Sequence, residues 1–214
     1  MAQEREDDPV VEEGWDPPIV AFDFDGTLTV RDSYTAFLKW RTPAFRWWLG
    51  SLRLAPAAVA YLFHRDRGRI KAAATKVFLS GVPRERLEAD ARRFAELFSR
   101  KLLRPDAMIA WKRWRTKRVK LVIVTASPDI VVAPFARGLA AHDLLGTPLA
   151  FDAQDRVTGA FSSPNCRGAE KVARLKAAYG PDLRVHAAYG DTSGDTEMLA
   201  IAEQPYFRVF TGKP

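Results

Sequence analysis

Two pairs of aspartates are the side chains of this sequence best placed for nucleophilic and acid–base chemistry. Asp23 and Asp25 lie two residues apart, so in a continuing strand both carboxylates would point the same way. Gly26 follows them and lets the chain turn. One carboxylate could attack an electrophile while the other handles the proton of the leaving group. The second pair, Asp191 and Asp195, lies in a later polar sequence.

Both pairs, and a group of hydroxyl residues, follow apolar runs that are typical of buried strands. The runs comprise residues 19–22, 120–124 and 184–189. The polar sequences directly after them are Asp23–Thr27, Thr125–Ser127 and Gly190–Asp195. Ligands of an open α/β sheet bind beyond the carboxyl ends of its strands, so we expect these sequences to converge at one edge.

The other segments complete an α/β pattern. Helices are expected after the cap Asp32-Ser33, over residues 87–102, from the N-cap Ser127, and over residues 169–179. A short hairpin is expected from residues 149–152 and 157–161, and a fourth core strand from residues 206–210. Strands that alternate with helices predict a Rossmann-like, mainly parallel sheet.

Four carboxylates at one edge of a sheet would repel one another unless a cation lay among them. Hard oxygen ligands of this kind suit Mg²⁺. Lys171, in a helix of its own, could neutralise a phosphoryl oxygen. Aspartate is also common in turns, and any one of these residues alone would be interpreted as a turn residue. The ordered set after three strands favours a site.

The sequence FDFDGTLT at residues 22–29 resembles the first motif of the haloacid dehalogenase superfamily of phosphohydrolases. Val124-Thr125 is similar to the second motif, Lys171 fits the third, and Gly190–Asp195 fits the fourth. All four occur in the expected order between residues 19 and 210. The resemblance implies a Mg²⁺-dependent phosphomonoester hydrolase.

The resemblance also implies a role for each site residue. Asp23 would be the nucleophile that forms an aspartyl-phosphate, and Asp25 the general acid and then the base. Mg²⁺ would be held by Asp23, the backbone carbonyl of Asp25, and Asp191. Asp195 would support the metal site. The phosphoryl oxygens would be held by Thr125, Ala126 and Lys171.

A long helical insertion between the first two motifs resembles the first type of cap in this superfamily. The chain would then comprise a disordered acidic tail (1–16), a phosphohydrolase core (17–31 and 119–214) and a helical cap (32–118). Residues 166–172 and 207–209 are similar to bacterial phosphatidylglycerophosphatases of the superfamily, and the chain resembles phosphoserine phosphatases more distantly. The latter usually carry glutamate where Asp32 stands, so Asp32 is either a substrate contact or a helix N-cap.

Composition and charge limit the class of partner. With 47% hydrophobic and 28% charged residues, the chain is neither disordered nor fibrous. The single cysteine, Cys166, allows no internal disulfide and fits a reducing compartment. Residues 31–118 hold 22 Lys/Arg against 7 Asp/Glu, which suggests an anionic partner: lipid headgroups, nucleic acid or a phosphorylated substrate. The basic residues 111–118 could contact nucleic acid, but no recognised binding motif accompanies them.

Residues 47–63 are mostly apolar, and Arg53 is their only charged residue. Tryptophans lie near one end, as at membrane interfaces, and basic residues flank the segment: Arg41, Arg46, Arg65, Arg67, Arg69 and Lys71. The segment is too short to span a bilayer, and it is expected to be a re-entrant or interfacial helical pair broken near Pro56. Packing within the cap or a dimer interface is the alternative.

These observations predict an enzyme that dephosphorylates phosphatidylglycerol phosphate, cytoplasmic or peripheral on the cytoplasmic face of the inner membrane. An anionic membrane surface is the expected partner, nucleic acid is disfavoured, and no obligate protein partner is evident. A soluble monoester such as phosphoserine is the alternative substrate. From a different class, the chain could be an inactive membrane- or nucleic-acid-binding module.

Overall fold

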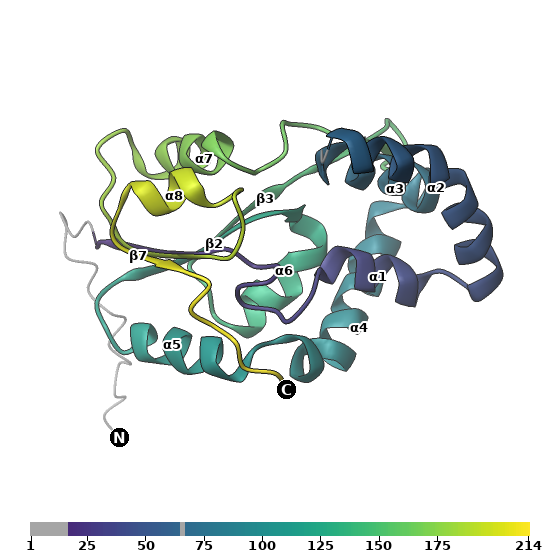
Figure 1. Cartoon of the computed structure of the whole chain (residues 1–214). Coiled ribbons are helices and arrows are strands. Elements are labelled where there is room, and N and C mark those ends of the chain that lie inside the picture. The colour runs from purple at the N-terminus through teal and green to yellow at the C-terminus, as the bar shows by residue number, and fades with distance from the viewer. Residues whose placement is uncertain (1–16, 65–66) are drawn as a thin grey trace, which may run out of the picture.

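The structure, a computed structural model, describes residues 17–64 and 67–214. Its centre is a five-stranded sheet of order β3-β2-β1-β6-β7, in which every neighbouring pair is parallel (Figure 1). The strands are β1 (Ile19–Phe22), β2 (Lys120–Pro128), β3 (Asp143–Thr147), β6 (Val185–Gly190) and β7 (Ala202–Phe207). The predicted α/β fold with a mainly parallel sheet is confirmed.

Eight helices and one hairpin surround the sheet in the described part of the chain. The helices between β1 and β2 are α1 (Ser33–Arg41), α2 (Ala44–His64), α3 (Arg67–Leu79), α4 (Arg84–Leu102) and α5 (Pro105–Arg115). The later helices are α6 (Asp129–Gly138), α7 (Ala169–Tyr179) and α8 (Thr196–Ala200). The antiparallel hairpin consists of β4 (Leu149–Phe151) and β5 (Val157–Phe161).

Alternation along β1 divides the core into two layers, because successive side chains of a strand point to opposite faces. Ile19 and Ala21 pack in the cluster that includes side chains of α7 and α8. Val20 and Phe22 pack in the larger cluster, with Trp111 of α5 and residues of α1, α4 and α6. Burial on both faces explains why β1 is apolar throughout, and it leaves polar residues only where the strand ends.

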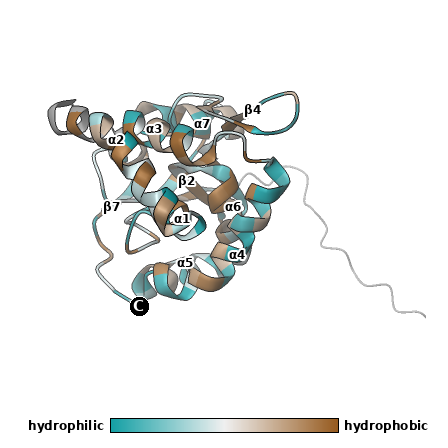
Figure 2. Cartoon of the chain, turned by 90° about the vertical axis from the view of Figure 1, so that its right-hand side faces the viewer, coloured by the Kyte–Doolittle hydropathy of each residue, from teal (hydrophilic) through white to brown (hydrophobic). Residues whose placement is uncertain are grey.

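Helices α2 and α3 lie side by side at the far end of the molecule from α5 (Figures 1 and 2). Helix α3 also packs against β5, where Gly159 leaves room because a Cβ there would overlap the Ser80 Oγ. By contrast, α4 and α5 share the large core cluster with the sheet. The division into core and cap at residues 32 and 118 stays a prediction.

The structure differs from the expected elements in three places. Strand β3 was not predicted, because it is an edge strand with a charged residue and a glycine in its five positions. The last strand covers residues 202–207 rather than 206–210. The break expected near Pro56 is wrong: α2 continues through it, and the carbonyl of Leu52 that loses its helical donor lies on the exposed side of the helix.

The predicted acidic tail and Arg65 of the basic flank lie outside the described residues. Within the described ranges, no helix combines the length and the apolar character needed to cross a bilayer.

Candidate active site

Asp23, the residue directly after β1, forms a buried ion pair with Lys171 of α7. The Lys171 Nζ donates to the Asp23 Oδ1 at 2.6 Å and to the Val124 carbonyl at 2.6 Å. Burial raises the pKa of Asp23 to about 7, although the charge of Lys171 opposes that shift. Burial would lower the pKa of Lys171, but Asp23 and Asp195 together raise it, so the ammonium stays charged.

Asp195 supports both the lysine and the loop that follows β6. Its Oδ1 lies 2.8 Å from the Lys171 Nζ, while its Oδ2 accepts from the backbone N–H groups of Asp191 at 3.1 Å and Thr192 at 2.9 Å. Burial would raise the pKa of Asp195, but Lys171 and these amides hold it below its usual range. Both carboxylate oxygens are therefore occupied by the protein, which fits the predicted supporting role.

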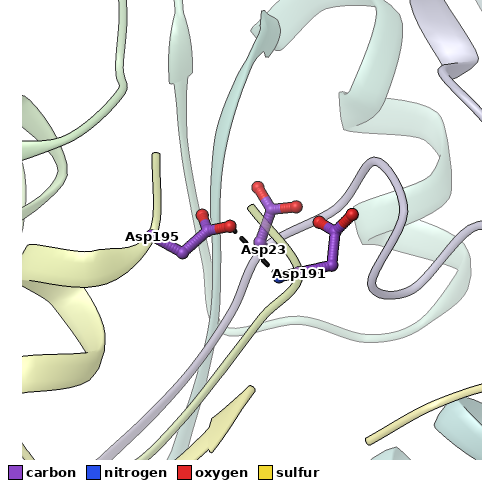
Figure 3. Close-up of side chains that lie close together, drawn as sticks. All are labelled: Asp23, Asp191 and Asp195. Carbon is purple, nitrogen blue, oxygen red and sulfur yellow. Dashed lines mark hydrogen bonds between the residues drawn. The ribbon is translucent and has the colours of Figure 1, made fainter. Parts of the chain in front are cut away.

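Asp23, Asp191 and Asp195 form an acidic cluster whose nearest ligand atoms all lie within 4.8 Å of one another (Figure 3). The Asp191 carboxylate accepts only from the Thr27 hydroxyl, at 3.3 Å, among the described residues, and burial and Asp195 raise its pKa. Both oxygens of Asp195 already have partners, but within the described ranges the Asp23 Oδ2 accepts no hydrogen bond and the Asp191 carboxylate accepts only from Thr27, so hard oxygen atoms remain for a cation. This donor set fits a divalent cation such as Mg²⁺.

Asp25 lies in the turn after β1 and is held by two donors. The Ser33 backbone N–H donates to its Oδ1 at 2.7 Å, and the Ser127 hydroxyl donates to its Oδ2. Burial and the nearby charge of Asp32 raise the pKa of Asp25. The expectation of a continuing strand is wrong, because β1 ends at Phe22. The turn nevertheless brings Asp23 and Asp25 to the same pocket.

Gly26 makes that turn possible in two ways. Its φ of +92° lies in the left-handed region that disfavours side chains, and a Cβ there would overlap the Asp191 Oδ2. We therefore expect Gly26→Ala to displace Asp191 and to abolish most activity. Gly180→Ala is the matched control, since its φ is +89° but its Cβ would meet nothing within 4 Å.

Both alanine variants should lose about 1–2 kcal/mol of unfolding free energy from backbone strain. Only Gly26→Ala should also lose Mg²⁺ affinity, which calorimetric titration can measure. Equal activity of the two variants would contradict the expected displacement of Asp191.

A pocket of about 200 Å³ joins these groups. Of the predicted phosphate contacts, Thr125, Ala126 and Lys171 all line it. The buried Thr125 hydroxyl accepts from the Ser127 backbone N–H at 3.1 Å, within the irregular last part of β2. The structure thus brings every site residue predicted from the sequence to one pocket, including Asp32.

Asp32 is both an N-cap and a wall of the pocket. Its Oδ1 accepts from the Thr35 backbone N–H at 2.6 Å, and its Oδ2 lies 3.5 Å from the Lys71 Nζ. Burial would raise the pKa of Asp32, but Lys71 and the Thr35 amide lower it. Asp32 is therefore an N-cap that is also paired with Lys71, and its contact with substrate stays a prediction.

Sequence reasoning missed four residues at the site. Lys71 donates to the Ser127 hydroxyl at 3.1 Å, although the sequence placed it in the flank of the apolar segment. Ser127 was expected to be a helix N-cap, but α6 begins after Pro128 and the Ser127 side chain bonds Asp25 instead. The sequence signal that could have assigned Ser127 to the site was its position two residues after Thr125. The other two are Asn165, which no motif marked, and Arg167, which belongs to the compared sequence 166–172 but received no role at the site.

Residues 20–200 match the family described as haloacid dehalogenase-like hydrolase. The chain belongs to this family. It is also 58% identical, over 203 residues, to Protein CicA of Caulobacter vibrioides (strain NA1000 / CB15N). That alignment covers 95% of this chain and 91% of the relative.

Solved structures show the same fold at low sequence identity. A protein of unknown function from Bordetella pertussis Tohama I is 20% identical with a TM-score of 0.69, and the match covers 86% of each chain. A phospho-aspartyl intermediate analogue of phosphoserine phosphatase is 16% identical with a TM-score of 0.55, covering 87% of this chain and 83% of that one. These similarities support the fold of the chain.

Proposed function

We propose that this hydrolase is a Mg²⁺-dependent phosphatase that cleaves phosphomonoesters through an aspartyl-phosphate on Asp23. The observation that carries the proposal is the shared pocket of Asp23, Asp25, Lys171 and the acidic cluster. A nucleophilic carboxylate, a second carboxylate able to carry a proton, and a buried ammonium are the groups that phosphoryl transfer requires.

In the first step, an Asp23 carboxylate oxygen attacks phosphorus and the bond to the ester oxygen breaks. Protonated Asp25 gives its proton to the departing alkoxide, so the alcohol leaves neutral. The raised pKa of Asp25 favours the protonated form that this step needs. The Lys171 ammonium, 2.6 Å from Asp23, offsets negative charge on the phosphoryl oxygens during transfer.

In the second step, Asp25 takes a proton from water, and the water oxygen attacks phosphorus. The bond between phosphorus and the Asp23 oxygen breaks, which releases inorganic phosphate and restores the carboxylate. The Ser33 amide and Ser127 hydroxyl hold Asp25 in place for both transfers.

Asp23, Asp191 and the backbone carbonyl of Asp25 are proposed to hold Mg²⁺, with Asp195 positioning Lys171 and the loop after β6. A bound divalent cation neutralises charge on the phosphoryl group as it is transferred.

Asp191→Ala is expected to lower activity chiefly by weakening Mg²⁺ binding. Among the described residues this carboxylate accepts one long hydrogen bond, at 3.3 Å from Thr27, so its oxygens remain available to the ion. The Mg²⁺ concentration for half-maximal activity should rise about tenfold or more, and excess Mg²⁺ should restore part of the rate. Ca²⁺ should inhibit, since its larger and looser coordination misplaces Asp23. Full activity of the parent enzyme in excess chelator would refute the metal site.

For the substrate, we propose a phospholipid phosphomonoester, with phosphatidylglycerol phosphate as the leading case. The pairing of Asp32 with Lys71 supports this choice against phosphoserine, because the Lys71 ammonium lies 3.5 Å from the Asp32 Oδ2 and would compete with the ammonium group of that substrate. The exposed apolar residues and the net positive charge of the helices between β1 and β2 support an anionic membrane surface as the partner. The proposed location is peripheral, on the cytoplasmic face of the inner membrane.

Phosphate release from a panel of monoesters tests the substrate class. The panel contains phosphatidylglycerol phosphate in mixed micelles, phosphoserine, glycerol 3-phosphate and an activated aryl phosphate. The lipid should give the highest kcat/KM. A higher kcat/KM for phosphoserine would replace the lipid proposal with a soluble substrate, and no hydrolysis of any member with Mg²⁺ present would overturn the phosphatase itself.

A further inference from the structure

A second cavity, of about 580 Å³, lies between α1, α2, α3 and α4. It shares no lining residue with the candidate active site in the described part of the chain. Its walls are basic: Asp90 is the lone acidic residue among the described lining side chains, whereas five arginines line the cavity. These are Arg41, Arg46, Arg53, Arg86 and Arg93. We refer to this cavity as the arginine pocket.

Internal ion pairs leave much of this positive charge uncompensated. Asp90 accepts from the Arg41 Nε at 2.8 Å and lies 3.2 Å from the Arg86 Nε, so one carboxylate serves two arginines. Arg93 lies 3.8 Å from Glu96. Arg46 and Arg53 make no ion pair with another residue of the described ranges. Guanidinium groups gathered in a cavity match the oxygens of a phosphate group, which they can bind in a bidentate manner.

Helix α2 joins the arginine pocket to an apolar surface. Arg46, Gly50 and Arg53 recur at helical spacing and line the pocket, while Trp47 faces α3 and stacks on Phe78 with ring centroids 4.8 Å apart. A third side of the helix is apolar and open to solvent. Its members are Phe45 (70% exposed), Trp48 (60%), Leu52 (55%) and Val59 (55%).

Leu49 connects these two sides, since it lines the pocket and is 36% exposed. The ribbon of α2 carries both hydrophilic and hydrophobic turns at the edge of the molecule (Figure 2). The surface of α2 therefore combines four large exposed apolar side chains with a neighbouring group of arginines. Anionic phospholipid offers both complements at once, a phosphate and acyl chains.

We infer that the arginine pocket binds the phosphate group of an anionic phospholipid while the exposed side of α2 enters the bilayer surface. The occupant is a lipid of the membrane itself, held at a site separate from the one where the substrate reacts. The inference rests on the membrane partner in the proposed function, and it adds a defined headgroup site to it. Binding at this site requires no catalysis.

Sedimentation with vesicles tests the pocket, using phosphatidylcholine alone or mixed with phosphatidylglycerol. The catalytically impaired Asp23→Asn protein is used so that the assay reports binding alone. Arg46→Gln/Arg53→Gln should lower partitioning onto the anionic vesicles by about tenfold or more. Arg100→Gln/Arg115→Gln, which removes the same charge from exposed positions outside the pocket, should change it less than about threefold.

A lysine variant separates a headgroup site from diffuse attraction. Arg46→Lys/Arg53→Lys keeps the charge but loses the planar fork, so it should also bind several-fold more weakly. Trp48→Ala should weaken binding, whereas Ile109→Ala, an apolar change at an even more exposed position on α5, should not. Hydrolysis of a soluble aryl phosphate by the arginine variants in the active background should stay unchanged.

Several outcomes would overturn the inference. If the lysine variant bound anionic vesicles as tightly as the parent protein, the arginines would act only through their net charge and not as a headgroup site. Tight binding of inorganic phosphate or glycerol phosphate to the pocket without vesicles, abolished in the glutamine variant, would identify a soluble ligand. Dimerisation in ultracentrifugation that Trp48→Ala abolishes would identify a second copy of the chain as the occupant. By contrast, if no phosphomonoester were hydrolysed but vesicle binding remained intact, the proposed phosphatase activity would be refuted and the headgroup site would not.

Discussion

Replacing Asp23 by asparagine should reduce phosphomonoester turnover by about 10⁴-fold or more and leave the protein folded. An amide cannot attack phosphorus as a carboxylate does, and the change also removes a proposed metal ligand. Stability should be preserved, because Asp23 is a buried carboxylate whose pKa burial raises to about 7. In the variant, Lys171 still donates to the Val124 carbonyl and pairs with Asp195.

Steady-state kinetics and thermal unfolding check both halves of this expectation. Asp182→Asn makes the same chemical change at an exposed position and should behave like the parent protein. Mass spectrometry should accompany the assay, because deamidation of the introduced asparagine would regenerate the nucleophile. Substantial turnover by verified, uncontaminated Asp23→Asn would rule out the aspartyl-phosphate.

Replacing Lys171 by methionine should cause the largest loss of stability among these variants and abolish activity. The lysine is 1% exposed, and its ammonium lies within 2.8 Å of acceptors on Asp23, Asp195 and Val124. Methionine leaves two buried carboxylates without their counter-ion, which should lower the unfolding free energy by about 3–5 kcal/mol in urea titrations. Lys176→Met on the same helix is exposed and should change it by less than about 0.5 kcal/mol.

A double variant isolates the interaction. In the Lys171→Met background, Asp23→Asn removes one of the two uncompensated charges and should restore about 1–3 kcal/mol. The same asparagine change in the parent protein should have little effect on stability. If the two changes were simply additive, the ion pair would not be the origin of the loss.

Most residues of the site could be predicted from the sequence, because they directly follow the apolar runs of three strands. Asp23, Thr125 and Asp191 each follow an apolar run, and parallel strands place their carboxyl ends together. The glycine after Asp25 signalled a turn, which the structure shows as a positive φ. Helix α7 was predictable in both its bounds, since Gly180 ends it and Ala169 begins it after a glycine.

Contacts that depend on tertiary packing were out of reach of the sequence. Lys71 enters the pocket only because α3 folds back over the loop after β1, and its basic neighbours favoured a surface role. Edge strand β3 has too mixed a composition to be recognised, and its place follows from its pairing with β2. Pro56 was expected to break the helix, because the sequence does not show that the carbonyl losing its donor lies on the exposed side of α2.

The central place of β1 has a consequence for how the protein is made. This strand is the first of the described chain, yet its two neighbours, β2 and β6, begin about a hundred and more than a hundred and sixty residues later. During synthesis β1 therefore waits with both edges open, which is the situation that favours aggregation and chaperone binding. Asp23 meets Lys171 and Asp195 only after the residues through Asp195 have left the ribosome, so the site cannot assemble before that stage of synthesis.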